Sequence, residues 1–180
     1  MKRSKRILAL LLSMVLLFGM LPMSALAADS TFSDVKTSDW FYDDVRYVCE
    51  NGLMNGTGSG TFSPKATTTR GMIVTILYRM EGSPAVSGAS SFQDVKADAY
   101  YNNAVIWAAA NGIVTGVSST QFCPDNAITR EQFAAILFRY AQYKGMDAVT
   151  AEENLAAFPD GGSVSGYAVS AMNWAVGAGL

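Results

Sequence analysis

The chain contains two copies of one sequence unit. When residues 32–80 are set above residues 92–140, no gap is needed and 16 of the 49 aligned positions are identical, whereas composition alone gives about three. A third, partial copy opens at Phe158. Self-similarity at a fixed period is typical of structural units that bury their apolar faces against one another. We therefore expect tandem units rather than one conventional globular domain.

Each copy has the pattern of a helix, a loop and a second helix. Gly52 and Gly112 follow the first apolar stripe of each copy, where a helix ends in the left-handed conformation. The second helix opens at Thr69 in the first copy and at Thr129 in the second, and Thr129 with Gln132 forms a capping box. The sequence therefore predicts an all-α fold of tandem helix-loop-helix repeats.

Residues 1–27 have the composition of an export signal. Four cations at positions 2, 3, 5 and 6 precede an apolar run over 7–21, and the run is followed by Ala25-Leu26-Ala27, which fits the small-x-small rule for signal peptidase. Fifteen apolar residues reach only about 22 Å as a helix, short of the roughly 30 Å that a membrane span needs. We expect cleavage between Ala27 and Ala28 and no retention in the membrane.

Composition and motifs together predict the organisation of the whole chain. The stretches between the copies are rich in small and polar residues, which is typical of connectors. The expected segments are a signal peptide (1–27), a first repeat (32–82), a linker (83–91), a second repeat (92–144), a linker (145–157) and a partial third repeat (158–180).

Charge and the absence of histidine exclude several classes of function. The signal holds four of the 13 lysines and arginines and none of the 15 acidic residues, so the remainder, nine basic against 15 acidic, has a net charge of −6. Such a chain lacks the clustered cations that nucleic acid or an anionic membrane surface requires. Without histidine there is no Ser-His-Asp triad, no Cys-His pair and no His-ligated metal. Whether Cys49 and Cys123 form a disulfide stays open.

Five motifs recur in order in both complete copies: Phe-x-Asp-Val, an aromatic pair, Asn-Gly-(Leu/Ile)-x-x-Gly, Phe-x-Pro, and Thr-Arg before the second helix. With these motifs the chain resembles the S-layer homology (SLH) domain over residues 32–180, as two complete repeats and a truncated third. After the arginine both copies depart from the family's Thr-Arg-Ala-Glu pattern, reading Gly71-Met72 in the first and Glu131-Gln132 in the second.

The resemblance implies a fold and a function. Three units would pack as a pseudo-threefold assembly in which the first helices form a central bundle and grooves lie between neighbours. The family holds secreted proteins at the bacterial cell surface, in the cell wall or S-layer, without catalysis. Its partner is an anionic secondary cell-wall polysaccharide attached to peptidoglycan, often carrying pyruvate ketals. An anchor of this kind normally carries a cargo domain or acts with a partner chain, and it needs no cofactor.

The strongest candidate ligand-binding residues are the Thr-Arg pairs. Thr69-Arg70 and Thr129-Arg130 each place a permanent cation beside the free backbone N–H groups of a helix N-terminus. An arginine fork binds a carboxylate through two hydrogen bonds, which suits a carboxylated sugar. The alternatives are simple capping by the threonines and ion pairs between the arginines and neighbouring acids.

Three pairs of equivalent residues are secondary candidates for ligand binding: Asp34 and Asp94, Trp40 and Tyr100, and Gly56 and Gly116. The aspartates could instead cap a local turn, and the aromatic residues could belong to the core. The glycines indicate a close backbone approach or a turn with positive φ.

Other classes of function remain as alternatives. A glycosidase with two carboxylates needs no histidine, but most acids of the first copy do not recur in the second. A calcium-dependent docking module would need an Asp-x-Asp-x-Asp-Gly loop, and none occurs. The main alternative is a protein–protein interaction or assembly repeat at the cell surface that does not bind glycan.

Overall fold

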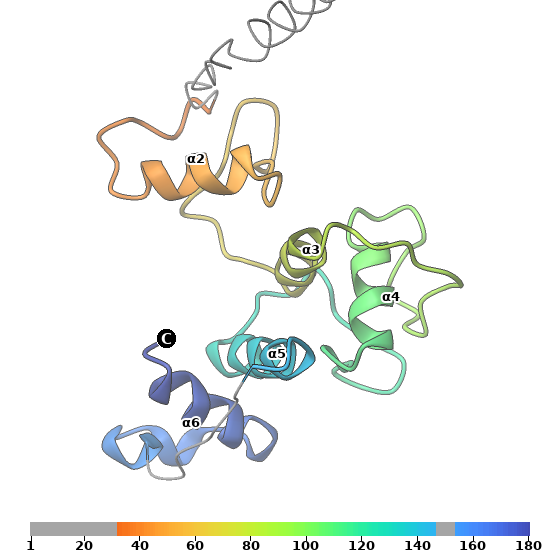
Figure 1. Ribbon diagram of the computed structural model, residues 1–180, viewed down its shortest axis with the longest axis vertical. Helices are drawn as coiled ribbons and strands as arrows, with labels where there is room; N and C mark the ends of the chain where they lie inside the picture. The colour runs from red at the N-terminus through yellow and green to blue at the C-terminus, as the bar shows by residue number, and fades with distance from the viewer. Residues whose placement is uncertain (1–31, 147–153) are drawn as a thin grey trace, which may run out of the picture.

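The computed structural model describes residues 32–146 and 154–180 (Figure 1). This part contains α-helices and short 3-10 turns and no named strand, as expected for an all-α fold. Its helices are α2 (Tyr42–Glu50), α3 (Arg70–Met80), α4 (Asn102–Ala110), α5 (Arg130–Tyr143) and α6 (Val169–Gly177). No helix in these ranges is long and apolar enough to cross a membrane. The expected export signal, its cleavage site between Ala27 and Ala28, and most of the second linker lie outside the described residues.

The first helices of the two complete repeats end in the same way. Gly52 and Gly112 adopt φ angles of 67° and 68°, which is the left-handed conformation expected just after a helix. The side-chain amides of Asn51 and Asn111 donate to the carbonyls of Tyr47 and Trp107, both at 2.8 Å. The predicted ends of these two helices are therefore confirmed.

The second helices begin at the predicted threonines. The hydroxyl of Thr69 accepts a hydrogen bond from the N–H of Met72 at 3.3 Å. Thr129 and Gln132 form the complete capping box, in which each side chain accepts from the other residue's backbone N–H. The capping function of both threonines follows from this geometry, because a free N–H group at each helix start is satisfied.

The loops between the helices share one internal architecture. The carboxylate of Asp34 accepts from the N–H groups of Phe62 and Ser63 at 2.8 and 2.7 Å. Asp94 accepts from the two equivalent N–H groups, those of Phe122 and Cys123, at 2.9 and 2.7 Å. Each aspartate thus ties the head of a repeat to its Phe-x-Pro motif, 28 residues further on.

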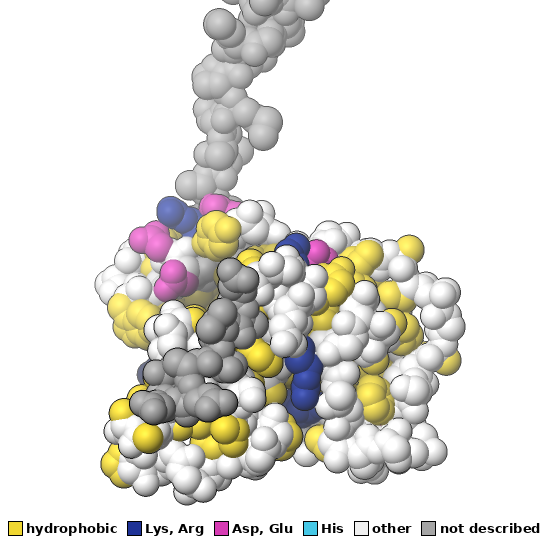
Figure 2. All heavy atoms as spheres, turned by 60° about the horizontal axis from the view of Figure 1, so that its bottom comes forward, with side chains coloured by type: hydrophobic (Ala, Val, Ile, Leu, Met, Phe, Trp, Pro, Cys, Tyr) yellow, Lys and Arg dark blue, Asp and Glu magenta, His cyan; other side chains and the backbone are white. Residues whose placement is uncertain are grey.

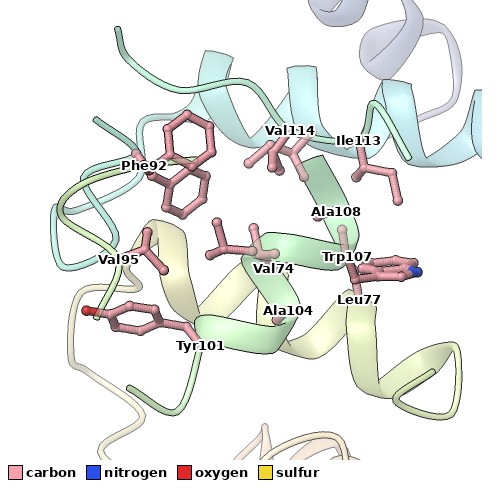
Figure 3. Packing of buried hydrophobic residues seen from close by; sticks show 13 residues of the cluster. Val74, Leu77, Phe92, Val95, Tyr101, Ala104, Trp107, Ala108, Ile113 and Val114 are labelled. Atoms are coloured by element: carbon pink, nitrogen blue, oxygen red, sulfur yellow. The ribbon is translucent and has the colours of Figure 1, made fainter. Parts of the chain in front are cut away.

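The main core lies where α3 of the first repeat packs on α4 of the second (Figure 3). Val74 and Leu77 of α3 are buried against Ala104 and Ala108 of α4, with Trp107 beside them. The alanines let the two helices approach closely, because they add little side-chain bulk between the axes. The two repeats therefore share one hydrophobic core and are not independent structural units.

The same relation recurs between α5 and α6. Ala134 and Ala135 of α5 are buried against Ala171 and Ala175 of α6, and the rings of Phe138 and Trp174 lie 5.7 Å apart. Before α6, the chain runs through three short 3-10 turns: η1 (Asn154–Ala157), η2 (Gly161–Ser163) and η3 (Gly166–Ala168). The second helix of each complete repeat thus packs on the first helix of the segment that follows.

This pairing corrects the expected central bundle of first helices. In the described ranges the packed α-helix pairs are α3 with α4 and α5 with α6, while α2, α4 and α6 lie apart from one another (Figure 1). The physical reason is the placement of small residues, because the alanine faces of α4 and α6 are covered by the apolar stripes of α3 and α5.

Candidate functional site

Arg70 lies inside the boundary between the first two repeats and is only 5% exposed. Its Nε donates to the carbonyl of Phe122 at 2.8 Å and its Nη2 donates to the carbonyl of Thr115 at 3.2 Å. The guanidinium carbon lies 4.6 Å from the centroid of the Phe122 ring, within reach of a cation–π interaction. Burial lowers the pKa of Arg70 from its usual value. The side chain therefore holds the second repeat's loop and forms none of the described ion pairs.

The N-terminus of α3 is covered by the same loop. The N–H of Arg70 donates to the carbonyl of Asn126 at 3.1 Å, and the N–H of Gly71 donates to that of Pro124 at 2.8 Å. A Cβ atom at Gly71 would lie 2.9 Å from the ring of Tyr101, which explains why this repeat has glycine after the arginine. The donors expected to bind an anion here are thus occupied by protein carbonyls.

Arg130, the equivalent residue of the second repeat, has different surroundings. It is exposed, and no described residue forms a hydrogen bond or an ion pair with its guanidinium. It borders a pocket of about 590 Å³ between the start of α5 and the segment that leads into α6, whose lining includes Thr129, Phe158, Asp160 and Ser163. This pocket combines an unpaired cation, hydroxyl groups and an aromatic ring that is 46% exposed at Phe158.

Glu131 also lines that pocket and fixes the segment before α6. Its carboxylate accepts hydrogen bonds from the N–H and hydroxyl of Ser165 at 2.9 and 3.1 Å, and from the hydroxyl of Tyr167 at 3.1 Å. The N–H of Ser165 is the main cause that lowers the pKa of Glu131. The carboxylate of Glu131 is therefore hydrogen-bonded to Ser165 and Tyr167, whereas no described residue bonds to the guanidinium of Arg130.

A second pocket, of about 360 Å³, lies in the first repeat. Its lining includes Asn55, Gly56, Phe62, Arg79 and Tyr100, so the structure brings together two of the secondary candidates, Gly56 and Tyr100. Arg79 donates to the carbonyl of Leu53 at 2.9 Å. Arg79 was not among the residues predicted to bind a ligand, although its identity with Arg139 at the repeat period is a signal that could have identified it.

The remaining candidate ligand-binding residues fall into two groups: some hold the loops in place, and others lie exposed on the surface. Both carboxylates of the aspartate pair are engaged by the loop N–H groups described above. A Cβ atom at Gly56 would lie 2.8 Å from the ring of Phe32, and one at Gly116 would lie 2.6 Å from that of Phe92. Backbone carbonyl oxygens of the same loops lie closer still, so both glycines allow the close backbone approach that the sequence predicts. Trp40 and Tyr100 are 88% and 58% exposed, and thus lie on the surface and not in the core.

The described residues contain no group of three or more acidic or cysteine side chains that could hold a metal ion. Cys49 and Cys123 are both free and partly buried, and burial raises the pKa of the Cys49 thiol. Figure 2 shows one face of the molecule, on which acidic side chains gather near the N-terminal end and cationic side chains form a short column in the seam between two lobes.

Comparison with known proteins identifies the repeats. The family model of the S-layer homology domain matches residues 31–71 and 91–134. These two ranges contain the aspartates, the loop glycines and the Thr-Arg pairs described above. They correspond to the two complete repeats that the self-similarity of the sequence predicts, so the predicted family is confirmed.

Relatives with long similar segments include an enzyme and surface proteins. The chain is 33% identical over 178 residues to an endoglucanase of Bacillus sp. strain KSM-635, covering 95% of this chain and 19% of that protein. It is 32% identical over 162 residues to the surface-layer 125 kDa protein of Lysinibacillus sphaericus, covering 90% of this chain and 13% of that protein. A cellulosome-anchoring protein of Acetivibrio thermocellus is 27% identical over 117 residues, covering 61% of this chain and 25% of that protein.

The chain thus spans less than a fifth of the length of the first two of these relatives. What it shares with an enzyme and with surface-layer proteins alike is the repeated module, which is non-catalytic in this family. S-layer homology domains anchor proteins to the cell envelope, which implies binding to the cell wall at the bacterial surface. The chain is an SLH domain protein that carries two S-layer homology repeats.

Proposed function

We propose that the chain is a wall-anchoring module that binds an anionic, pyruvylated secondary cell-wall polysaccharide through the pocket beside Arg130. The observation that carries this proposal is the exposed guanidinium of Arg130, which no described residue pairs, at the edge of a cavity of about 590 Å³. A pyruvate ketal carries a carboxylate, and an arginine fork binds a carboxylate through two parallel hydrogen bonds.

The other residues of the pocket suit a sugar. The ring of Phe158 is 46% exposed, so a sugar face can stack on it. The hydroxyl of Ser163 offers a hydrogen-bond donor and acceptor, and that of Thr129 still has its proton to donate while it caps α5. The carboxylate of Asp160, which also lines the pocket, accepts hydrogen bonds from sugar hydroxyls. Because it is negatively charged, it repels a ligand that carries several negative charges. The pocket therefore favours one carboxylate on an otherwise neutral saccharide.

Arg70 takes a supporting part in this proposal. Its donors face the carbonyls of Phe122 and Thr115, so it acts on the ligand site only by holding the second repeat in place. Thr69 acts in the same way, as the cap of α3. Trp40 and Tyr100, which are exposed at equivalent positions, add stacking surfaces along a polymer that extends beyond one pocket.

The wider proposal concerns arrangement and location. This wider proposal includes the segment boundaries given above and export through the N-terminal signal. It also includes a pseudo-threefold arrangement of the three repeat segments. In that arrangement each second helix covers the next first helix, as α3 covers α4 and α5 covers α6. The cargo would be a further domain or a partner chain, in keeping with the greater length of the relatives.

Co-sedimentation with purified wall sacculi tests the proposal. The mature chain (28–180) should pellet with sacculi that carry the pyruvylated polymer and should stay in solution after the polymer is stripped by acid. Arg130→Gln should reduce pelleting at least about tenfold, because a two-bond ionic contact contributes roughly 1.5–3 kcal/mol. Arg46→Gln is the matched control, since Arg46 lies on α2 and pairs with Asp43 and Glu50, outside the pocket. Unchanged pelleting of a folded Arg130→Gln variant would contradict the proposed site.

A further inference from the structure

The sequence contains three asparagines that are each followed by glycine: Asn51, Asn55 and Asn111. An asparagine before glycine is open to deamidation, in which the backbone nitrogen of the glycine attacks the side-chain carbonyl of the asparagine. Glycine has no Cβ atom that would hinder this attack. The three pairs are equivalent in sequence, but two of them lie at helix ends and one lies in a loop, so the structure distinguishes them.

The two pairs at helix ends are hydrogen-bonded at both reacting groups. At the end of α2 the side-chain amide of Asn51, the group that would leave, donates to the carbonyl of Tyr47 at 2.8 Å. The N–H of Gly52, which would supply the attacking nitrogen, donates to the carbonyl of Cys49 at 2.9 Å. The pair 111–112 at the end of α4 makes the same two bonds, at 2.8 and 3.1 Å. Both bonds must break before the attack, so these pairs are protected.

The third pair, Asn55 with Gly56, has no such protection. Asn55 lies exposed in the loop after α2. Within the described ranges no residue forms a hydrogen bond with its side chain or with the N–H of Gly56. The second repeat has Thr115 in place of Asn55, so its loop lacks the reactive pair. In the first repeat the leaving amide and the attacking nitrogen are therefore both without a competing partner.

We propose that Asn55 is a modification site, at which the folded chain deamidates selectively. The backbone nitrogen of Gly56 forms a bond to Cγ of Asn55, and the bond between Cγ and the side-chain nitrogen breaks. That nitrogen leaves as ammonia and takes the proton that Gly56 loses. Water then opens the resulting succinimide ring at one of its two carbonyls, which leaves aspartate or isoaspartate at position 55.

The reaction changes the charge of the pocket of about 360 Å³ in the first repeat. Asn55 and Gly56 both line this pocket, and Arg79 is the one charged residue among the described residues of the lining. A new carboxylate at position 55 therefore neutralises a pocket that is cationic before the reaction. Isoaspartate also adds a methylene group to the main chain beside Gly56, where a Cβ atom would already lie 2.8 Å from the ring of Phe32. This inference does not depend on the glycan proposal, which concerns the pocket at Arg130.

Peptide mapping by mass spectrometry tests the inference. The folded full chain is incubated at mildly alkaline pH, where the attacking nitrogen loses its proton more readily, and samples are digested with trypsin over time. The peptide 47–65 contains both Asn51 and Asn55, so fragment ions of one peptide compare the two sites directly. Asn55 should convert to the acid at least about tenfold faster than Asn51 or Asn111, because two hydrogen bonds must break at each of the protected pairs.

Unfolding and two variants supply the controls. In concentrated urea the three pairs should react at similar rates, because the protecting hydrogen bonds are lost. Asn55→Thr, which introduces the residue found at position 115 of the second repeat, should leave only the slow reaction at Asn51 in the peptide 47–65. Asn55→Asp should elute with the modified chain on anion exchange.

Two results would overturn the inference. The first is that Asn55 reacts no faster than Asn51 in the folded chain. The second is that Asn55 keeps the same advantage over Asn51 in urea, because the selectivity would then come from the local sequence and not from the fold.

Discussion

Arg70 and Phe122 meet across the boundary between the two repeats, where one phenylalanine offers both its carbonyl, at 2.8 Å from Nε, and the face of its ring, at 4.6 Å from the guanidinium carbon. Arg130 has the same place in the second repeat but faces an open pocket. Two arginines at equivalent positions thus have different surroundings, because among the described residues a loop packs against Arg70 and none packs against Arg130.

The first prediction concerns the stability of these two arginine positions. Arg70→Ala should lower the free energy of unfolding by about 2–4 kcal/mol, because it leaves the buried carbonyl of Phe122 without its donor and removes the guanidinium that packs on the Phe122 ring. Arg130→Ala, at an exposed position, should change it by less than about 0.5 kcal/mol. Urea unfolding followed by circular dichroism measures both. Equal effects at the two positions would contradict the structural role assigned to Arg70.

The second prediction concerns the glycines that lie against aromatic rings. Gly71→Ala and Gly116→Ala would place a Cβ atom 2.9 Å from the ring of Tyr101 and 2.6 Å from that of Phe92. Each should cost about 1–3 kcal/mol of stability. At Gly71 the packed ring must move, and at Gly116 the loop backbone must move as well, because the carbonyl oxygens of Ser118 and Gln121 lie even closer to the Cβ position than the ring does. Gly162→Ala is the control, since nothing lies within 4 Å of its Cβ position, and its melting temperature should be unchanged. A wild-type melting temperature for Gly71→Ala would contradict this explanation of the glycine after Arg70.

The sequence predicted local structure well because local signals determine it. The similarity of 32–80 to 92–140 located the repeats, the threonines located the helix starts, and the glycines at 52 and 112 located the helix ends. The different surroundings of Arg70 and Arg130 were not predictable, because they depend on which segment packs against each helix. The packing of α3 on α4 was missed for the same reason, since alanine faces do not reveal which helix covers them.

The third prediction concerns acid stability. The carboxyl of Glu131 has its pKa lowered below the usual 4.5, mainly by the N–H of Ser165. A carboxylate with a lowered pKa stabilises the folded state above its unfolded pKa, and this contribution is lost as the pH falls through the folded pKa. The stability of the wild type should therefore decrease below about pH 4.5, and Glu131→Gln should reduce the steepness of that decrease. Urea unfolding at a series of pH values measures it, and identical slopes would contradict the contact between α5 and the third segment.

The last prediction concerns alkaline pH and the contact between the ends of α3 and α5. The hydroxyl of Tyr140 donates to Glu81 Oε1 at 2.5 Å, and Lys144 pairs with the same carboxylate at 2.9 Å. Burial, with the bond to Glu81, raises the pKa of Tyr140 from 10.0 to about 12. Because the folded pKa is the higher one, the stabilisation is complete below pH 10 and is lost as the pH rises towards 12.

Tyrosinate absorbance measures this shift directly. One of the eight tyrosines should ionise near pH 12, and Tyr140→Phe should remove that late step from the titration. Glu81→Gln should bring the step to lower pH, because the neutral amide no longer opposes the phenolate by its charge. If the late step persists in Tyr140→Phe, it belongs to another tyrosine. In that case the contact between α3 and α5 is not the cause of the raised tyrosine pKa.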